Sequence, residues 1–270
     1  GFLIPFTVLY IIFLFDNKIH SREDLELVNL DVSGEIPFFD LPEEEKVFSN
    51  PDDRSVISES FRMLMSNLRY IQKNDSESNV IVVTSSIKGE GKTLNALNLA
   101  LSFASVGKKV LLMGCDLRNP QLHKYTNCDK NVPGIVDFLV DNKTDWKKNI
   151  INPFDSQPLD ILLSGPLPPN PLNLINNGNI DILLKEARKT YDYIIIDSAP
   201  TLLVADTKSL INKADVLFFI VRCNFTDKDI LSHISKISND YDAKCWINFK
   251  WCWREKFIWI WLWLWLWLQL

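Results

Sequence analysis

The sequence has no excess of basic residues. Its 29 lysines and arginines are outnumbered by 34 aspartates and glutamates, which gives a formal net charge of −5. A general nucleic-acid binder needs a positive surface to face the phosphate backbone. The acidic balance argues against that class of protein, so we expect no nucleic-acid partner.

The sequence also lacks cysteines in metal-binding pairs. Five cysteines lie at positions 115, 128, 223, 245 and 252. None of these spacings matches a zinc motif, and the number is odd. Reduced thiols of the cytosol are the simplest account.

Charge is missing from residues 1–15, which read GFLIPFTVLYIIFLF. The segment also lacks the basic start and the cleavage site of a signal peptide. A bilayer span needs ~20 apolar residues, but the chain begins with Gly1 rather than Met, so we expect it to be a fragment. We interpret residues 1–16 as the end of a transmembrane helix, with a buried core helix as the alternative. Lys18 and Arg22 follow and favour a cytoplasmic exit.

The clearest motif is a glycine-rich loop, TSSIKGEGKT, at residues 84–93. It lies between an apolar β-branched run and a helical pattern at 94–106, which is the context of a P-loop. The candidate nucleotide-binding residues are Lys88, Gly89, Glu90, Gly91, Lys92 and Thr93. Lys92 would reach the phosphates and Thr93 would coordinate Mg²⁺. Ser86 stands where the strict pattern has glycine, and the alternative is an ordinary glycine-rich turn before a helix.

Apolar runs and helical patterns alternate after residue 79. Strands are predicted at 80–83, 110–114, 159–163, 193–197 and 216–221, and helices at 94–106, 180–190, 206–213 and 227–238. Continuous apolar strands separated by helices indicate a parallel sheet covered on both faces. The sequence therefore predicts an α/β fold of the P-loop NTPase class, with phosphate bound at the carboxyl ends of the strands.

Two of the predicted strands lead to an aspartate. Asp116 follows the run VLLMGC, and Asp197 follows the run YIII. Carboxylates at this edge can hold Mg²⁺, and Asp197 could take a proton from an attacking hydroxyl. An aspartate after a strand is also a common turn residue, but two of them downstream of a P-loop favour ATP-dependent phosphoryl transfer. The predicted catalytic residues are Lys92, Asp116 and Asp197, and the predicted metal ligands are Thr93, Asp116 and Asp197.

Residues 17–78 are predicted to form a juxtamembrane linker that ends in a possible oligomerisation helix. A helix start is indicated at 21–24 and a turn at 34–37. Apolar positions recur at helical spacing between 59 and 71, which predicts an amphipathic helix. Its polar face carries Glu59, Arg62 and Arg69. This face either binds a partner or is solvated.

Four segments of the sequence match known motifs in combination. They are the Walker A loop Ser85–Thr93, the Walker A′ segment Asp116–Pro120 with His123 beyond it, the Walker B strand Ile194–Asp197 followed by Ser198-Ala199-Pro200, and the loop Ser164–Pro171. In this combination the chain resembles the bacterial tyrosine kinases of capsule and exopolysaccharide systems, the BY-kinases, from the membrane exit to about residue 244. The resemblance implies a MinD/ParA-like P-loop fold with ATP and Mg²⁺ as cofactors. It also implies a place at the bacterial inner membrane, with the kinase domain facing the cytoplasm.

The resemblance further implies an autokinase that phosphorylates tyrosines near its own C-terminus. Subunits of a ring-shaped homo-oligomer would act on their neighbours, and a phosphatase would oppose them. The phosphorylation cycle would regulate the polysaccharide polymerisation and export machinery. Lys92 carries over as phosphate ligand, Thr93 as Mg²⁺ ligand, and Asp116 and Asp197 as the two acidic residues. Residues 1–15 resemble the second of two membrane helices in the family's gram-negative form.

Two departures from the family pattern leave other functions open. Glu59 and Arg62 match the ring-forming pattern E-x-x-R-x-x-R, but Met65 replaces the last arginine, for which Arg69 could substitute. Lys88 stands where MinD and ParA type ATPases have a signature lysine, and it either touches a phosphate across an interface or is solvated. The alternatives are therefore a MinD/ParA-type ATPase switch and a catalytically weak scaffold or chain-length regulator.

Residues 246–270 differ in composition from the rest of the chain. They hold eight of the nine tryptophans and end in alternating Trp and Leu. A membrane-surface anchor and an aggregation-prone strand are the structural interpretations. The family has an Asn-Gly-Val stretch and a tyrosine-rich tail here, often of alternating Gly and Tyr.

Our hypothesis for this tail is a frameshift just before Trp246. Loss of the first base turns every TGG codon into a glycine codon, and a TTA before it becomes a tyrosine codon. Reading the gene in that frame tests the idea, which fails without a Gly-Tyr-rich continuation. If the frame is real, we expect the last strand and the phosphate-accepting tail to be lost. The predicted divisions are 1–16 (membrane helix), 17–78 (linker), 79–245 (kinase domain) and 246–270 (aberrant tail).

Overall fold

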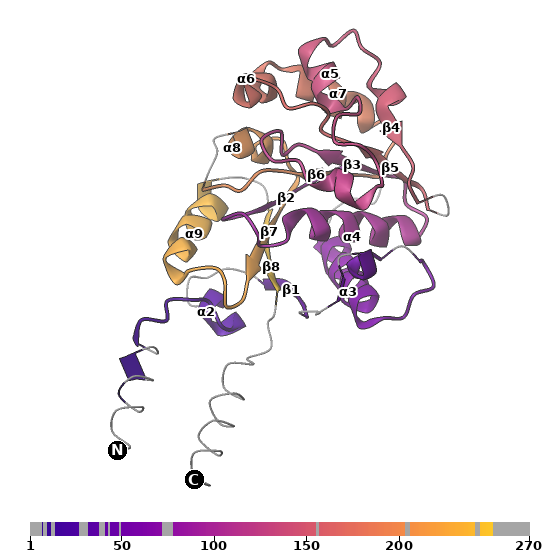
Figure 1. Cartoon of the computed structure of the whole chain (residues 1–270). Helices are drawn as coiled ribbons and strands as arrows, with labels where there is room; N and C mark the ends of the chain where they lie inside the picture. Colours follow the sequence, from indigo (N-terminus) through magenta and orange to yellow (C-terminus); the bar gives the residue numbers. More distant parts are fainter. Residues whose placement is uncertain are drawn as a thin grey trace.

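The computed structural model describes residues 7, 10–11, 14–26, 32–37, 41–42, 44–48, 50–71, 78–154, 157–202, 206–240 and 244–250. Within them, eight strands form one sheet in the order β1-β8-β7-β2-β6-β3-β5-β4. Figure 1 shows this sheet between two layers of helices.

All neighbouring strands run parallel except β4, which pairs antiparallel with β5. The strands are β1 (Val32–Ile36), β2 (Asn79–Ser85), β3 (Val110–Gly114), β4 (Ile150–Ile151), β5 (Leu159–Leu162), β6 (Tyr193–Asp197), β7 (Val216–Arg222) and β8 (Lys244–Lys250). Strands β3 and β6 are buried along their whole length. This is the result expected of a parallel sheet, because helices leave neither face to solvent.

The helices divide between the two faces of the sheet. They are α2 (Arg22–Glu26), α3 (Val56–Ile71), α4 (Lys92–Ser105), α5 (Ile135–Val140), α6 (Pro171–Asn176), α7 (Asn179–Ala187), α8 (Asp206–Ile211) and α9 (Leu231–Asp240). Short 3-10 segments are η1 (Glu44–Lys46), η2 (Leu122–Tyr125), η3 (Trp146–Asn149) and η4 (Lys228–Ile230). Alternate residues of β2 show the division: Ile81 and Val83 pack with α3 and α4, while Val80 and Val82 pack with α5 to α9. The predicted α/β fold with helices on both faces is confirmed.

Two expectations about strands are wrong. The turn expected at 34–37 is mostly strand, because residues 32–36 form β1 and pair in parallel with β8. The last strand is not lost, since residues 244–250 form β8 and pair with β7 from Val216 to Arg222. Strand pairing uses main-chain groups, and Trp, Ile and Phe in this run favour strands, so the sequence as given supports β8.

The predicted transmembrane helix and most of the predicted aberrant tail lie on residues that the structure does not describe. In the part that the structure describes, no helix is long and apolar enough to cross a membrane. Most of residues 1–15, where the transmembrane helix is predicted, lie outside the described residues, as do residues 251–270.

The predicted amphipathic helix is confirmed as α3. Phe61, Leu64 and Met65 are buried on its inner face. Arg62 donates to Glu59 at 2.6 Å within the same chain. Met65, at the position of the family's last arginine, therefore contributes to the core, while the side chain of Arg69 lies outside the described residues.

The chain before α2 lies against the loop that follows β7. Ile19 is fully buried and makes two main-chain hydrogen bonds to this loop, donating to Thr226 at 2.9 Å and accepting from Asn224 at 2.8 Å. Lys18 adds an ion pair with Asp227 at 2.7 Å and donates to the Phe225 carbonyl oxygen at 2.9 Å. Residues 18 and 19 therefore fix the position of the loop after β7.

We expect Gly134→Ala to destabilise the fold by about 1–3 kcal/mol, the usual cost of overpacking. A Cβ at Gly134 would lie 2.3 Å from the Leu163 carbonyl oxygen and 2.5 Å from the Gly165 nitrogen, and backbone atoms yield little. Gly34→Ala is the matched control, because its Cβ would meet side-chain atoms of Leu64, the nearest at 3.0 Å, and no backbone atom within 4 Å. Chemical denaturation of both variants checks the difference, and equal effects would contradict it.

Candidate nucleotide-binding site

The P-loop, residues 86–91, joins the buried strand β2 to α4. Gly89 and Gly91 have φ angles of +97° and +94°, a left-handed conformation that residues with a Cβ rarely adopt. The first N–H groups of α4 have no helical partner and form the positive end of its dipole. Loop and helix together therefore form an anion-binding end of the kind that holds phosphate.

Lys92 is the first residue of α4 and lies in an almost enclosed position. Its Nζ is 2.8 Å from Asp116 Oδ2, and its side chain is 11% exposed. Burial lowers the pKa of Lys92, but the carboxylates of Asp197 and Asp116 outweigh burial and raise the pKa above its ordinary value. Lys92 is therefore a fixed positive charge beside the P-loop.

Asp116 lies two residues after the end of β3, and Asp197 is the last residue of the neighbouring strand β6. Asp197 is paired with Gly114 in the sheet, and its carbonyl oxygen accepts from the Cys115 N–H at 2.8 Å. The Asn119 N–H donates to Asp116 Oδ1 at 3.0 Å, which fixes that carboxylate in the turn after β3. The structure thus brings together the two aspartates that the sequence suggested.

Asp197 has a buried oxygen without a partner. The residue is 1% exposed, and its Oδ1 makes no hydrogen bond within the described residues. Burial raises the pKa of Asp197 to about 6, while the Lys92 charge lowers it, Asp116 raises it and a Thr93 hydrogen bond lowers it. Because a buried oxygen without a partner is costly, this one fits a cation or a protonated ligand.

The donor set around Asp197 suits Mg²⁺. Thr93 supplies a hydroxyl and Asp116 a second carboxylate, which are the hard oxygen ligands this ion takes. Among the described residues, no group of three or more His, Cys, Asp or Glu is placed to hold a metal. Two carboxylates completed by phosphate and water are a common arrangement for Mg²⁺, so the residues fit the ion.

Two further candidates differ in their surroundings. Lys88 is exposed and forms no ion pair with a described residue, so its position leaves both interpretations open. Glu90 is fully buried, and its carboxylate accepts from the Ile87 N–H at 2.8 Å and from the Thr226 hydroxyl. Its side chain is thus engaged within the protein, and only its main chain remains for a ligand.

Sequence reasoning missed the contacts that brace this site from other strands. Arg118 donates to Asp206 at the start of α8, with Nε 2.8 Å from Oδ2. Arg222, the last residue of β7, and Thr226, in the loop after β7, contact the P-loop. The sequence could have indicated that the end of β7 lies near the P-loop, because parallel strands β7 and β2 end at the same edge of the sheet. It does not indicate which residue after β7 contacts the P-loop.

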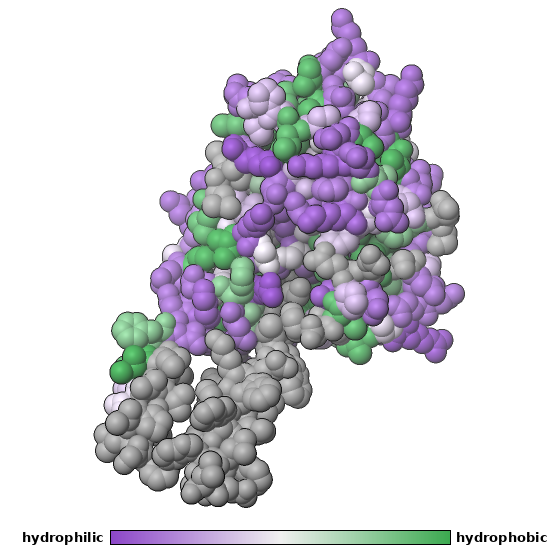
Figure 2. Space-filling view, in the orientation of Figure 1, coloured by the Kyte–Doolittle hydropathy of each residue, from purple (hydrophilic) through white to green (hydrophobic). Residues whose placement is uncertain are grey.

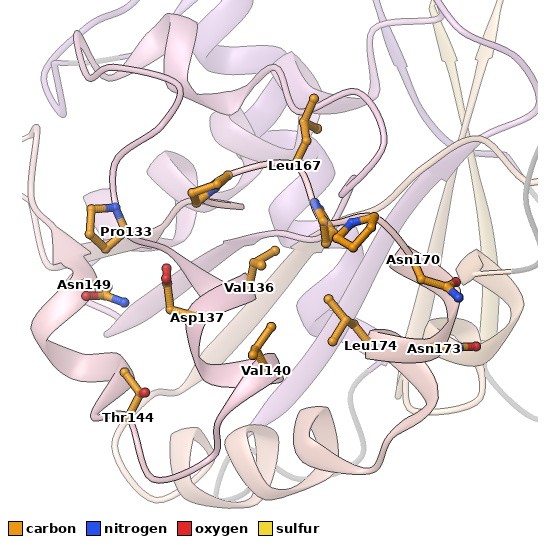
Figure 3. A pocket seen from close by; sticks show the side chains of 13 residues that line it. Pro133, Val136, Asp137, Val140, Thr144, Asn149, Leu167, Asn170, Asn173 and Leu174 are labelled. Atoms are coloured by element: carbon orange, nitrogen blue, oxygen red, sulfur yellow. The ribbon is translucent and has the colours of Figure 1, made fainter.

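A separate pocket of about 600 Å³ lies away from these residues. Figure 3 shows it between α5, the loop 166–170 and the start of α6. Its lining is largely apolar and includes none of the predicted site residues. In Figure 2, the described part of the visible face is mainly hydrophilic, with hydrophobic residues in separate groups.

Fold and site together define a P-loop nucleoside triphosphatase. Residues 78–245, more than half of the chain, match the family described as AAA domain. The MinD protein of Pyrococcus horikoshii, solved with Mg-ADP, has the same fold with a TM-score of 0.52 and 20% identity over 63% of this chain and 68% of its own. At that identity the likeness shows the fold alone.

Relatives define the family within that class. The tyrosine-protein kinase YwqD of Bacillus subtilis is 34% identical over 69% of this chain and 77% of its own length. The putative tyrosine-protein kinase EpsB of Ralstonia solanacearum is 33% identical over 64% of this chain, but this match spans only 22% of EpsB. The chimerical protein CapA2B2 has a TM-score of 0.76 and 29% identity, covering 85% of this chain and 98% of its own. The chain belongs to the bacterial tyrosine-protein kinases, as the motifs suggested.

We expect Asp197→Asn to stabilise the nucleotide-free protein more at pH 7.5 than at pH 4.5. The unfolded carboxyl ionises near its ordinary pKa of 3.8, whereas the folded one ionises near 6, so the unfolded state loses its proton first as the pH rises. Stability therefore falls as the pH rises through this window, by about 2 kcal/mol between pH 4.5 and 7.5.

Thermal unfolding at both pH values checks the effect of Asp197→Asn. Asp52→Asn, at an exposed position, is the control and should leave the pH dependence of stability unchanged. Equal stabilisation of the Asp197 variant at the two pH values would show that the folded pKa is not raised.

Proposed function

We propose that the chain is an ATP-dependent protein-tyrosine autokinase that regulates capsular or exopolysaccharide polymerisation and export. The observation that carries the proposal is the convergence of Lys92, Thr93, Asp116 and Asp197 at the carboxyl edge of the sheet. Relatives named as tyrosine-protein kinases supply the class of acceptor, and one of them, from Klebsiella pneumoniae, is named for a cps region.

The residues at this edge would bind the phosphates, hold the metal and accept a proton during phosphoryl transfer. Bound ATP with Mg²⁺ supplies the phosphoryl group and neutralises charge that develops on it. Main-chain N–H groups of the P-loop and the start of α4 bind the phosphates, and Lys92 adds a fixed positive charge. Thr93, Asp116 and Asp197 would hold the metal. Asp197 would accept the proton of the tyrosine hydroxyl as the tyrosine oxygen forms the new bond to the γ-phosphorus. The bond from that phosphorus to the β–γ bridging oxygen breaks at the same time, and ADP leaves.

Residues 242–270 hold no tyrosine, so the family's tyrosine-rich tail does not occur in the reading frame given. Tyr191 and Tyr193 are buried in the core and are therefore poor acceptors. An added peptide rich in Gly and Tyr, as in the family's tails, is therefore the appropriate substrate. Phosphorylation in trans also fits a ring in which each subunit serves its neighbour.

The proposed kinase is a homo-oligomer at the bacterial inner membrane. The family's ring pattern supports a homo-oligomer, although Arg62 is already bonded to Glu59 inside the chain. The apolar residues 1–15 support attachment to the bacterial inner membrane, with the kinase domain in the cytoplasm and an opposing phosphatase nearby. Sedimentation of the chain with and without nucleotide tests the oligomer, and a monomer under all conditions would contradict it.

We expect Lys92→Met to reduce phosphotyrosine formation on the added peptide by about a hundredfold or more, because the charge beside the transferred phosphate is lost. Lys143→Met, which removes an exposed lysine outside the predicted site, is the matched control. Lys88→Met tests the alternative, because a MinD-type switch would need the signature lysine. Labelled ATP measures both activities. ATP turnover without phosphotyrosine would favour the switch, and ATP binding without either activity would favour a scaffold.

A further inference from the structure

The P-loop is held from the side of β7 by three residues at the end of that strand and in the loop after it. Arg222 is the last residue of β7, a strand hydrogen-bonded to β2, and Phe225 and Thr226 follow in the loop; we name the three the β7 clamp. They contact Gly89 and Glu90, which belong to the turn that faces phosphate in a P-loop. This contact joins residues about 135 positions apart in the chain and is absent from the predicted motifs.

Thr226 holds the P-loop through the side chain of Glu90. Both residues are fully buried, and the Thr226 hydroxyl donates to Glu90 Oε1. The other carboxylate oxygen accepts from the Ile87 N–H at 2.8 Å, so one side chain ties the start of the loop to its middle. A buried carboxylate needs such donors, because each one that is lost leaves charge without compensation.

Arg222 and Phe225 hold the same turn through its main chain. Arg222 Nη1 donates to the Gly89 carbonyl oxygen at 2.9 Å, and its guanidinium lies 4.9 Å from the centre of the Phe225 ring. In a trans peptide the C=O and the next N–H point in opposite directions. Arg222 therefore directs the N–H of Glu90 away from the clamp. The Phe225 ring closes the space over Gly89, where an added Cβ would lie 3.2 Å from it.

The clamp is held together by hydrogen bonds of its own. The Thr226 N–H donates to the Arg222 carbonyl oxygen at 2.9 Å, and the Arg222 N–H donates to Thr226 Oγ1 at 3.1 Å. Asn224 between them has a left-handed φ of +56°, and main-chain bonds to Ile19 fix the loop from outside. A clamp held in this way can impose one conformation on the P-loop before any ligand arrives.

We propose that the β7 clamp is a positioning device for the phosphate-binding turn, with Thr226 as its central residue. The clamp sets the direction of the Gly89–Glu90 peptide and so fixes the phosphate-binding N–H groups in advance, which lowers the ordering cost of nucleotide binding. The proposal rests on nucleotide binding at the P-loop, as proposed above, and adds residues that touch neither nucleotide nor metal.

The test compares Thr226→Val, which keeps the shape but removes the donor, with wild type in the full chain. We expect the Kd for ADP with Mg²⁺ to rise about tenfold, the usual effect of losing one hydrogen bond to a charged group. Without nucleotide, we expect faster amide hydrogen exchange in residues 86–91 and unchanged exchange in β3. Thr226→Ser restores the donor and should return the Kd to within about twofold of wild type.

Controls separate positioning from stability. Thr126→Val removes another buried hydroxyl, one that donates to the His123 carbonyl oxygen, and should leave nucleotide affinity unchanged. If Thr226→Val does not fold, the same Kd and exchange measurements are made on Arg222→Met, which loses the bond to Gly89 at a half-buried position. Unchanged affinity and exchange in a folded clamp variant overturn the proposal alone. Failure of the wild type to bind nucleotide overturns both this proposal and the proposed function.

Discussion

The buried ion pair of Lys92 with Asp116, with Asp197 beside it, is the constraint around which the site is built. Removing these charges from water is costly, and such pairs are weak contributors to stability. Their retention at the meeting point of β3, β6 and α4 is therefore better explained by chemistry than by folding. Two parallel strands have to end side by side at the N-terminus of a helix for the three groups to meet, and the sheet order provides that placement.

Much of this arrangement was predictable from the sequence, and the reason is periodicity. Long apolar runs such as 193–197 and the glycines before Lys92 carry local signals, so the central strands, the P-loop and the aspartates were found. Strands β1 and β8 were missed because their pairing is set by a distant partner. The contact of Thr226 with Glu90 was missed for the same reason, since no local pattern marks which buried hydroxyl meets a carboxylate 136 residues away.

The site alone does not separate a kinase from an ATPase switch. Both need a P-loop, a lysine beside the phosphates and oxygen ligands for Mg²⁺, and the MinD fold supplies the same scaffold. The family was settled by relatives above 30% identity, which are named as tyrosine-protein kinases. What distinguishes the two functions is the group that accepts the phosphate, which is a tyrosine hydroxyl in a kinase and water in an ATPase switch.

The placement of β1 beside β8 has a consequence for self-association. A strand at the rim of a sheet offers unpaired main-chain groups to other chains, and short rim strands limit that hazard. Here β8, which leads into the tryptophan-rich residues, pairs with β7 along residues 244–250 and with β1 along residues 247–250, so the half of β8 next to those residues has a strand on each side. The rims of the described sheet are the five-residue β1, followed by Pro37, and the two-residue β4. The fold therefore offers little template for cross-β growth, even next to its most apolar sequence.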